Sequence, residues 1–306
     1  MANSANNKFP KIGLGTYKIA GDTGVIIIKQ AIQLGYRMFD TAFVYENEHI
    51  IGQAIREAIS EGTVSREELT VISKLGPCHH HPDRVEQGCR LSLLRLGLDY
   101  IDLYLLHTPV ALKYRSDDEL KPLDSDGKVE LDDELSPLDT WLALEKCVQK
   151  GLVRMIGVSN FNRSQLEQIL NGGNIRPTVN QVECSLKFHQ KELRDYCSNE
   201  GIKCMAFTPL GKPKANEMEN SFLNLDELQV IAKKYGKTSA QIALRYLVDL
   251  NVIPIPKSTN EARLKQNLEA LNFELQKEDM HKLDHLVEQK RLMTLNWLTH
   301  SKHYPF

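Results

Sequence analysis

The sequence lacks both a long apolar run and an excess of charge of either sign. It has 38 Lys and Arg against 40 Asp and Glu in 306 residues, a formal net charge of −2. No apolar run approaches the ~18 residues of a membrane span, and the N-terminal MANSANNKFP contains no apolar signal core. A nearly neutral chain gives no electrostatic reason to bind nucleic acid or an anionic membrane. We therefore expect a cytoplasmic protein with neither kind of partner.

Paired cysteine motifs are missing as well. The six cysteines are scattered without a C-x-x-C pair, at Cys78, Cys89, Cys147, Cys184, Cys197 and Cys204. In a chain of this length without a secretion signal, scattered cysteines are more often small buried hydrophobic residues than disulfide partners or zinc ligands. We expect free, buried thiols.

The common short nucleotide and metal motifs are also absent. The GLG triplet near the N-terminus is followed by Lys18 where a Rossmann fingerprint needs its third glycine. The later GKT has Ile231 where a P-loop needs glycine. A histidine cluster at 79–81 lacks paired ligands, and we interpret it as a surface loop. No metal site is predicted.

The sequence does contain an alternation of short apolar runs and segments with helical periodicity. Eight strands are predicted, at 12–17, 36–40, 69–74, 101–107, 153–159, 178–183, 202–207 and 251–256. Helices are predicted at 24–34, 47–60, 82–96, 138–150, 163–171, 190–200 and 226–249 (split at Gly236), and then at 260–270 and 278–289. This order favours right-handed crossovers and a parallel sheet that closes into a (β/α)8 TIM barrel. We expect residues 1–306 to form a single α/β domain, because such barrels commonly exceed ~250 residues.

One connection is unusually long. Residues 108–136 are irregular and acidic, and a loop of that length inside a compact domain is usually functional or mobile. It follows the fourth predicted strand, so it should rise from the C-terminal face of the barrel, where active sites of this fold lie. A solvated surface excursion and a substrate lid both remain open.

Polar side chains end consecutive predicted strands. Tyr17 ends the first, Asp40 and Tyr45 follow the second, Lys74 ends the third and His107 the fourth. A free phenol has a pKa of about 10, and a nearby ammonium lowers that value. Lys74, balanced by Asp40, would thus make Tyr45 a better proton donor, and a neutral His107 beside it could donate a hydrogen bond.

The stretch GYRMFDTAFVYENE, at 35–48, resembles the signature of the aldo-keto reductase family. FDTAFVY, ISK and LYLLH supply, in order, the residue types of that family's catalytic tetrad at Asp40, Tyr45, Lys74 and His107. The resemblance spans essentially the whole chain. It implies NADPH-dependent reduction of a small-molecule aldehyde or ketone to an alcohol, by a protein of a mostly monomeric family.

Later stretches resemble the family's segments that hold the nicotinamide. GVSNF and NQVE match the clamp, which implies that Ser159, Asn160 and Gln181 bind the carboxamide. AFTPLG matches the stretch that flanks the ring and the pyrophosphate, up to Leu210. Phe207 and Thr208 replace the usual Tyr and Ser there, which keeps an aromatic face and a hydroxyl.

IPKSTNEARLKQN matches the family's adenosine 2′-phosphate pocket. Lys257, Ser258 and Arg263 offer two cations and a hydroxyl, which suit a dianionic phosphate. Gln266 and Asn267 occupy the positions that contact adenine. The resemblance therefore implies NADPH rather than NADH.

The predicted substrate pocket differs from that of relatives that act on small aldehydes. Where these often have Trp, this chain has Tyr17, Gly76 and Thr108. Fewer aromatic walls predict a wider pocket, unless the long loop or the C-terminal tail fills it. The remaining predicted lining is apolar and includes Phe43, Val44 and Trp297. We expect bulky or hydrophobic carbonyl substrates, with ketosteroid-like compounds among the candidates.

Two other functions remain open. The same barrel could serve as a non-enzymatic NADPH-binding regulatory subunit or sensor. A β/α-barrel lyase or isomerase could use Lys74 as a Schiff-base nucleophile, although that reaction leaves Asp40 and Tyr45 without a role.

Overall fold

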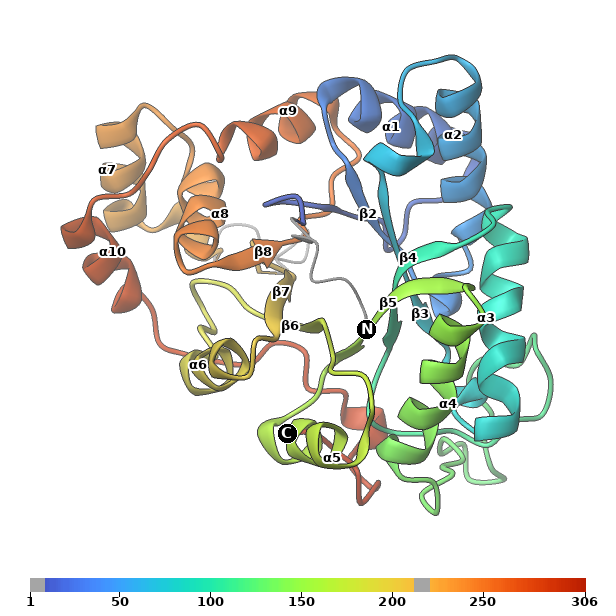
Figure 1. Cartoon of the computed structure of the whole chain (residues 1–306). Coiled ribbons are helices and arrows are strands. Elements are labelled where there is room, and N and C mark those ends of the chain that lie inside the picture. The colour runs from blue at the N-terminus through green and yellow to red at the C-terminus, as the bar shows by residue number, and fades with distance from the viewer. Residues whose placement is uncertain (1–8, 212–220) are drawn as a thin grey trace.

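Eight parallel strands form one continuous sheet in sequence order (Figure 1). The computed structural model describes residues 9–211 and 221–306. Every strand lies within a predicted apolar run or exceeds it by one residue. The strands are β1 (Leu14–Gly15), β2 (Met38–Asp40), β3 (Thr70–Leu75), β4 (Ile101–Leu106), β5 (Val153–Ser159), β6 (Val179–Glu183), β7 (Lys203–Phe207) and β8 (Val252–Pro254).

The sheet closes on itself between β8 and β1. Gly13 N donates to Pro254 O at 3.0 Å, and Gly15 N donates to Pro256 O at 3.1 Å. Glycine permits this approach, because a Cβ on Gly15 would lie 3.0 Å from Ile255 O. The predicted (β/α)8 barrel is confirmed.

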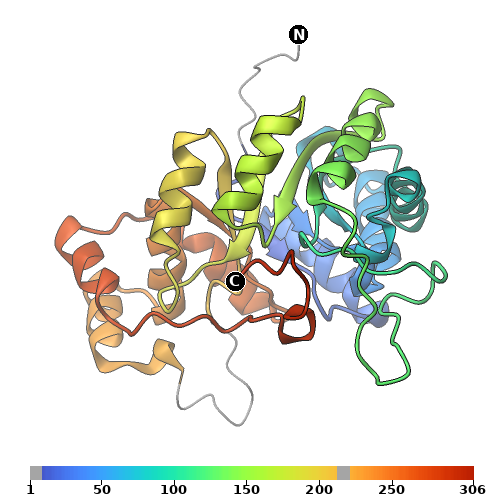
Figure 2. The same ribbon diagram turned by 90° about the horizontal axis from the view of Figure 1, so that it is seen from below.

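The helices connect the strands and cover the outside of the barrel (Figures 1 and 2). Those described are α1 (Gly21–Leu34), α2 (Glu48–Ser60), α3 (Pro82–Leu96), α4 (Pro137–Gln149), α5 (Arg163–Gly172), α6 (Lys191–Asn199), α7 (Asp226–Tyr235), α8 (Ser239–Asp249), α9 (Glu261–Glu269) and α10 (Lys277–Asp284). The helix predicted at 278–289 ends at Asp284. The chain beyond it is held by another segment, since Lys290 N donates to Lys187 O at 2.7 Å.

Side-chain alternation along the strands separates two cores. In β4, Leu103 and Leu105 point into the barrel, where they join the apolar cluster of Met38 and Met205. Tyr104 and the other alternate positions pack outward against the helices. The barrel interior is therefore filled with side chains, and the functional surface is left to the rim.

Helices α2 and α3 approach closely at Gly52. A Cβ on Gly52 would lie 1.8 Å from Leu96 O, so only glycine fits between the two backbones. One turn further along α2, Arg56 donates to the same carbonyl at the C-terminal end of α3. A cation at that position satisfies an unpaired carbonyl and complements the helix dipole.

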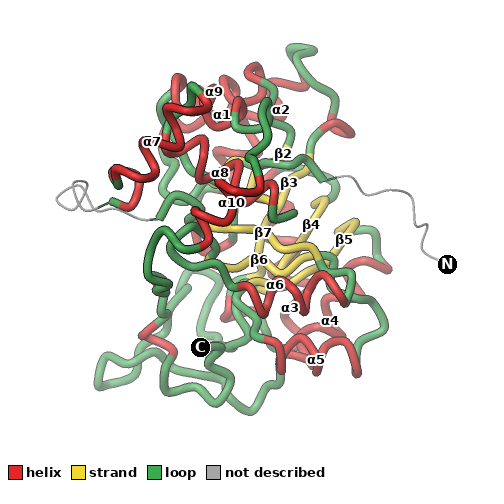
Figure 3. Tube along the Cα trace, turned by 90° about the vertical axis from the view of Figure 1, so that its left-hand side faces the viewer, coloured by secondary structure: helices red, strands yellow, loops and turns green. Residues whose placement is uncertain are grey.

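The long connection after β4 is an ordered part of the molecule. Isolated bridges join Leu112 to Leu131 and Leu123 to Val129. Val129 and Leu112 also pack against Leu298 of the C-terminal tail in a small apolar cluster. Figure 3 shows the loops concentrated on the side of the sheet where the C-terminus lies.

All six cysteines are buried and free, as predicted. In the described ranges, no helix combines the length and the apolar character that crossing a membrane requires.

Candidate active site

The four predicted catalytic side chains meet at the C-terminal ends of β2, β3 and β4. Asp40 is the last residue of β2, Lys74 lies near the end of β3, and His107 directly follows β4. Tyr45 ends the short 3-10 turn Phe43–Tyr45 that leads from β2 toward α2. Parallel strands deliver their carboxyl ends to one rim, which explains why residues far apart in sequence converge.

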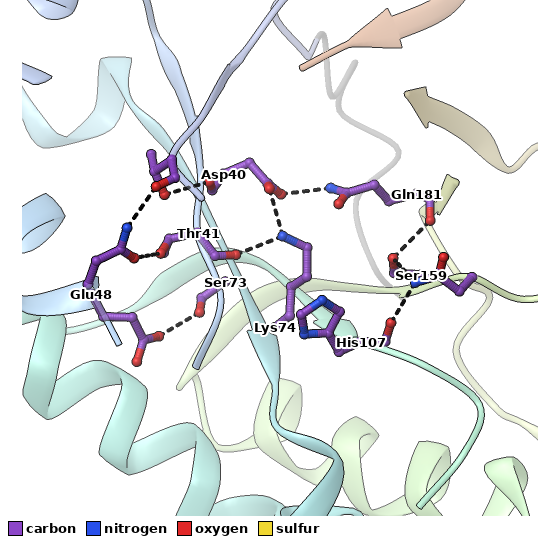
Figure 4. Close-up of polar contacts among 11 residues, drawn as sticks. Asp40, Thr41, Glu48, Ser73, Lys74, His107, Ser159 and Gln181 are labelled. Carbon is purple, nitrogen blue, oxygen red and sulfur yellow. Dashed lines mark hydrogen bonds and ion pairs between the residues drawn. The ribbon is translucent and has the colours of Figure 1, made fainter. Parts of the chain in front are cut away.

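Lys74 is fully buried and is held by two oxygens. Its Nζ donates to Asp40 Oδ1 at 2.6 Å and to Thr41 O at 2.8 Å (Figure 4). Gln181 Nε2 donates to the other oxygen of the same carboxylate at 2.7 Å. Burial lowers the pKa of Lys74, but the charge of Asp40 and the neighbouring Tyr45 offset it, so the pKa is raised overall. Lys74 is therefore an ammonium at neutral pH.

Tyr45 lies beside this ammonium and opens onto a cavity. Lys74 Nζ lies 5.0 Å from the centroid of the Tyr45 ring, and the Tyr17 ring is also 5.0 Å away. Burial raises the pKa of Tyr45, and the charge of Lys74 only partly opposes that rise. The prediction of a lowered pKa is wrong for this arrangement. The consequence is a phenol that keeps its proton at neutral pH and can donate it.

His107 is neutral, as predicted. Burial, together with the positive charge of Lys74 and the neighbouring His80, holds the pKa of His107 well below its usual value. Its ring lies edge-on to Tyr45, with centroids 5.7 Å apart. Its Nδ1 is buried without a hydrogen-bond partner among the described residues.

The predicted nicotinamide clamp is an interlocked set of polar groups at the end of β5 and in the middle of β6. Ser159 Oγ donates to Gln181 O at 2.9 Å. Asn160 Nδ2 donates to His107 O at 3.0 Å and to Ser159 Oγ at 3.1 Å. The clamp is therefore attached to the tetrad through both His107 and the carboxylate of Asp40 (Figure 4).

These side chains border a cavity of about 790 Å³. Its lining includes Asp40, Tyr45 and His107, all three clamp residues, and parts of the long loop and the C-terminal tail. In the described part of the chain, seven residues other than glycine have positive φ, and five of these line the cavity: Lys18, Glu46, Asn160, Thr208 and Leu295. Backbone strain of this kind is concentrated at functional sites.

Comparisons with known proteins agree with this geometry. The model of the Aldo/keto reductase family matches residues 11–288. The chain belongs to that family. Aldo-keto reductase family 1 member C1 of Macaca fuscata fuscata is 41% identical, over 97% of this chain and 94% of the relative. Member A1 of Xenopus tropicalis is 43% identical, over 94% of this chain and 90% of the relative.

A solved structure extends the likeness to three dimensions. The aldose reductase from Schistosoma japonicum matches with a TM-score of 0.91 at 37% identity, over 97% of this chain and 95% of that chain. This aldo/keto reductase is accordingly an oxidoreductase, and its family acts on carbonyl compounds. Members of the family use nicotinamide cofactors, generally NADP(H).

The far end of the cavity of the reductase fits the phosphates of such a cofactor. The pKa of Lys257 is lowered by partial burial and by the charges of Arg263 and Lys18, so three cations gather there. None of them has an ion-pair partner among the residues that the structure describes. Thr208 Oγ1 is also buried, with no hydrogen-bond partner in the described part of the chain. Uncompensated cations and an orphaned hydroxyl suit an anion.

Lys18 was not predicted from sequence. A cation one residue beyond the end of the first predicted strand, on the rim that carries Lys257, is the signal that could have identified it.

The other predicted cofactor residues divide into two groups. Phe207, Thr208 and Leu210 line the cavity. The rest lie beyond the lining, at the start of α9 and along it: Ser258, Arg263, Gln266 and Asn267. The Ser258 hydroxyl accepts a hydrogen bond from Asn260 N at 3.1 Å, which orders the entry to α9.

Four of the six predicted substrate-pocket residues line the cavity, namely Tyr17, Val44, Thr108 and Trp297. Phe43 and Gly76 do not. The Phe43 ring is fully buried and packs edge-on against His79 at 4.8 Å between centroids. A Cβ on Gly76 would lie 3.0 Å from Phe43 Cδ1, so the Phe43 ring occupies the space beside Gly76. The absence of a side chain at Gly76 therefore does not widen the pocket.

Several lining residues were missed because they depend on loop conformation. Pro77, Leu120 and Lys121 belong to this group. Leu120 and Lys121 show that the long loop forms part of the cavity wall.

The interpretation of the histidine cluster as a surface loop is wrong for two of its three residues, whereas His81 is exposed. His79 and His80 are 1% and 2% exposed. His79 Nε2 lies 2.9 Å from Asp117 Oδ1 of the long loop. Burial lowers the pKa of His80 to about 3. The loop folds over these side chains, a long-range contact that the local sequence does not reveal.

Proposed function

We propose that the protein reduces a ketone or aldehyde to an alcohol with NADPH, and that Tyr45 donates the proton. The observation that carries this proposal is the Tyr45 phenol, protonated and facing the cavity, between the Lys74–Asp40 ion pair and a neutral His107.

Each side chain has a distinct task in this reaction. Tyr45 gives its proton to the carbonyl oxygen, and Lys74 stabilises the phenolate that remains. Asp40 and Gln181 hold Lys74 in place, while His107 donates a hydrogen bond that orients the carbonyl. General acid catalysis of this kind contributes on the order of 10²–10⁴-fold. The cofactor, when bound, supplies the hydride.

The cations at 18, 257 and 263 support NADPH as the cofactor. A 2′-phosphate carries two negative charges, and NADH lacks that group. The Arg263 guanidinium can bind a phosphate through two parallel hydrogen bonds. The clamp of Ser159, Asn160 and Gln181 would fix the carboxamide, and positioning of this sort lowers the entropic part of the barrier.

The cavity supports a bulky or hydrophobic substrate. A volume of about 790 Å³ holds the nicotinamide end of a cofactor together with a substantial organic molecule. Val44, Leu298 and Trp297 make that end of the lining largely apolar. Ketosteroid-like compounds therefore belong on the test panel. We further propose a cytoplasmic monomer, in keeping with six buried thiols that form no disulfide.

The test follows oxidation of NADPH, and separately of NADH, by the purified protein against carbonyls from short aldehydes to bulky ketones. We expect turnover with NADPH and a loss of about 10²-fold or more in kcat for Tyr45→Phe. Tyr196→Phe, on the outer helix α6, is the matched control and should keep its activity.

A Tyr45→Phe variant as active as the wild type would remove Tyr45 from the mechanism. Tight binding of NADPH without turnover of any carbonyl would instead favour the non-enzymatic, cofactor-binding alternative. Equal turnover of a short polar aldehyde and a bulky ketone would contradict the proposed substrate preference.

A further inference from the structure

The charges around the cavity are unevenly distributed. The lining contains two carboxylates, Asp40 and Glu46, and three ammonium groups, on Lys18, Lys121 and Lys257. Asp40 is already neutralised by Lys74 at 2.6 Å. Lys18 and Lys257 gather with Arg263 at the end proposed to hold the cofactor phosphates. Lys121 is left as a cation of the lining with no role in the reaction described so far.

Lys121 lies at the substrate end, where the long loop meets the C-terminal tail. Its Nζ lies over the Trp297 ring, 5.1 Å from the centroid. The lining residues nearest to it in sequence and in the tail are apolar, and include Leu120, Leu295 and Leu298. Lys121 is itself exposed, so its attraction for an anion is modest and is screened by salt.

Among the described residues, none neutralises the charge of Lys121. Two other cations of the same loop are paired: Lys113 with Asp132 at 2.6 Å, and Arg115 with both Glu119 and Glu130 at 3.0 Å. Lys128 has no ion pair among the described residues either, but it does not line the cavity. In the described ranges, Lys121 has no ion pair or hydrogen bond, and its contact with Trp297 does not balance its charge.

The backbone that presents Lys121 is anchored on both sides. Cys78 Sγ donates to Leu120 O at 3.3 Å, and Glu130 N donates to Pro122 O at 2.9 Å. Four residues earlier, Asp117 accepts hydrogen bonds from Gln87 Nε2 at 3.0 Å and from Tyr114 OH at 3.1 Å. The ammonium therefore extends from a fixed point, so binding an anion there orders few additional residues.

We propose that Lys121 selects carbonyl substrates that carry a carboxylate at the end remote from the carbonyl. The inference rests on the proposed reductase activity and specifies its substrate class. The carbonyl meets Tyr45 and His107, an apolar chain follows the lining, and the carboxylate pairs with the ammonium over Trp297. The substrate carboxylate neutralises the Lys121 ammonium, whereas a neutral substrate of the same shape leaves that charge unpaired.

The experiment compares aldehydes that end in a carboxylate with their methyl esters, over chains of four to twelve carbons. The ratio of kcat/KM for acid and ester is measured with NADPH at low and at high ionic strength. We expect the wild type to prefer the acid by about fivefold at the best chain length, and salt to reduce that preference.

Lys121→Met keeps the apolar stem and removes the charge, and should bring the acid-to-ester ratio to about one. Lys113→Met is the matched control, because Lys113 lies in the same loop and pairs with Asp132 away from the cavity lining. It should keep the wild-type ratio.

The outcomes separate this inference from the reaction itself. If both substrates are reduced and Lys121→Met leaves the ratio unchanged, the role of Lys121 is refuted while the reductase stands. The same holds if the wild type never favours the acid. If no aldehyde or ketone is reduced at all, the proposed activity and this inference both fail.

Discussion

Charge at the tetrad is balanced residue by residue. Lys74 tolerates full burial because Asp40 Oδ1 and Thr41 O accept from its ammonium at 2.6 and 2.8 Å. The same ammonium favours the phenolate of Tyr45, against the burial that raises the pKa of that phenol. Removing the charge at Lys74 would therefore raise the pKa of Tyr45 further, although the Tyr45 side chain itself would be unchanged. Asp40 is a positioning residue in this arrangement, since it acts through Lys74.

Cofactor choice is also decided at the scale of single residues. Arg263→Ala removes the cation best suited to a 2′-phosphate, so we expect NADPH affinity to fall about 10- to 100-fold while NADH affinity changes little. Titration of protein fluorescence with each dinucleotide measures both affinities.

Lys265→Ala is the control for that change. Like Arg263, Lys265 is an exposed cation of α9, but it is not one of the three residues matched to the phosphate. An Arg263→Ala variant that binds NADPH as well as the wild type would show that NADPH selection lies elsewhere.

Among the described contacts between helices, the approach of α2 to α3 leaves the least room for a side chain at a glycine position. Gly52→Ala would put a Cβ 1.8 Å from Leu96 O, and backbone cannot move aside as a side chain can. We expect a loss of about 3 kcal/mol in the free energy of unfolding, measured by urea denaturation.

Gly24→Ala in α1 is the matched comparison. The closest atoms to its Cβ would be side-chain methyl groups, Ile50 Cγ2 at 2.8 Å and Ile19 Cγ2 at 3.0 Å, and the nearest backbone atom would be at 3.9 Å. Those groups can shift, and alanine improves helix propensity by up to about 1 kcal/mol. Equal stability of the two variants would mean that α2 and α3 separate easily.

The sequence predicted correctly those features that depend on a single strand or helix. Alternating periodicity located the strands, and strand ends located Asp40, Lys74 and His107, because a parallel barrel puts those ends on one rim. It failed where distant segments meet. The burial of His79 depends on Asp117 of the long loop, and the position of Phe43 beside Gly76 depends on how a 3-10 turn packs. Neither contact has a local sequence pattern.

For the whole molecule, the seam between β8 and β1 connects the fold to ligand binding. Two backbone hydrogen bonds close the barrel there, and β1 is only two residues long. Lys18 follows β1 and Lys257 follows β8, so an anion bound between them joins both sides of the seam.

NADP+ should therefore stabilise the folded protein more than NAD+ does. A ligand at 100 times its Kd adds about 2.7 kcal/mol to the stability of the state that binds it. Thermal unfolding with each dinucleotide at the same concentration measures this effect, and we expect the larger rise in Tm with NADP+. Equal shifts would contradict a role for the 2′-phosphate at the seam.

Because all six thiols are buried, their chemical modification can report where the folded protein opens. A thiol is alkylated only when the reagent can reach it and a thiolate can form. Cys78 lies beneath the long loop with its Sγ against Leu120 O, and burial raises its pKa to about 11. Cys147 lies deeper, in the core between α4 and its neighbours. Modification at Cys78 would thus report lifting of the cavity wall, and modification at Cys147 would report separation of the helices.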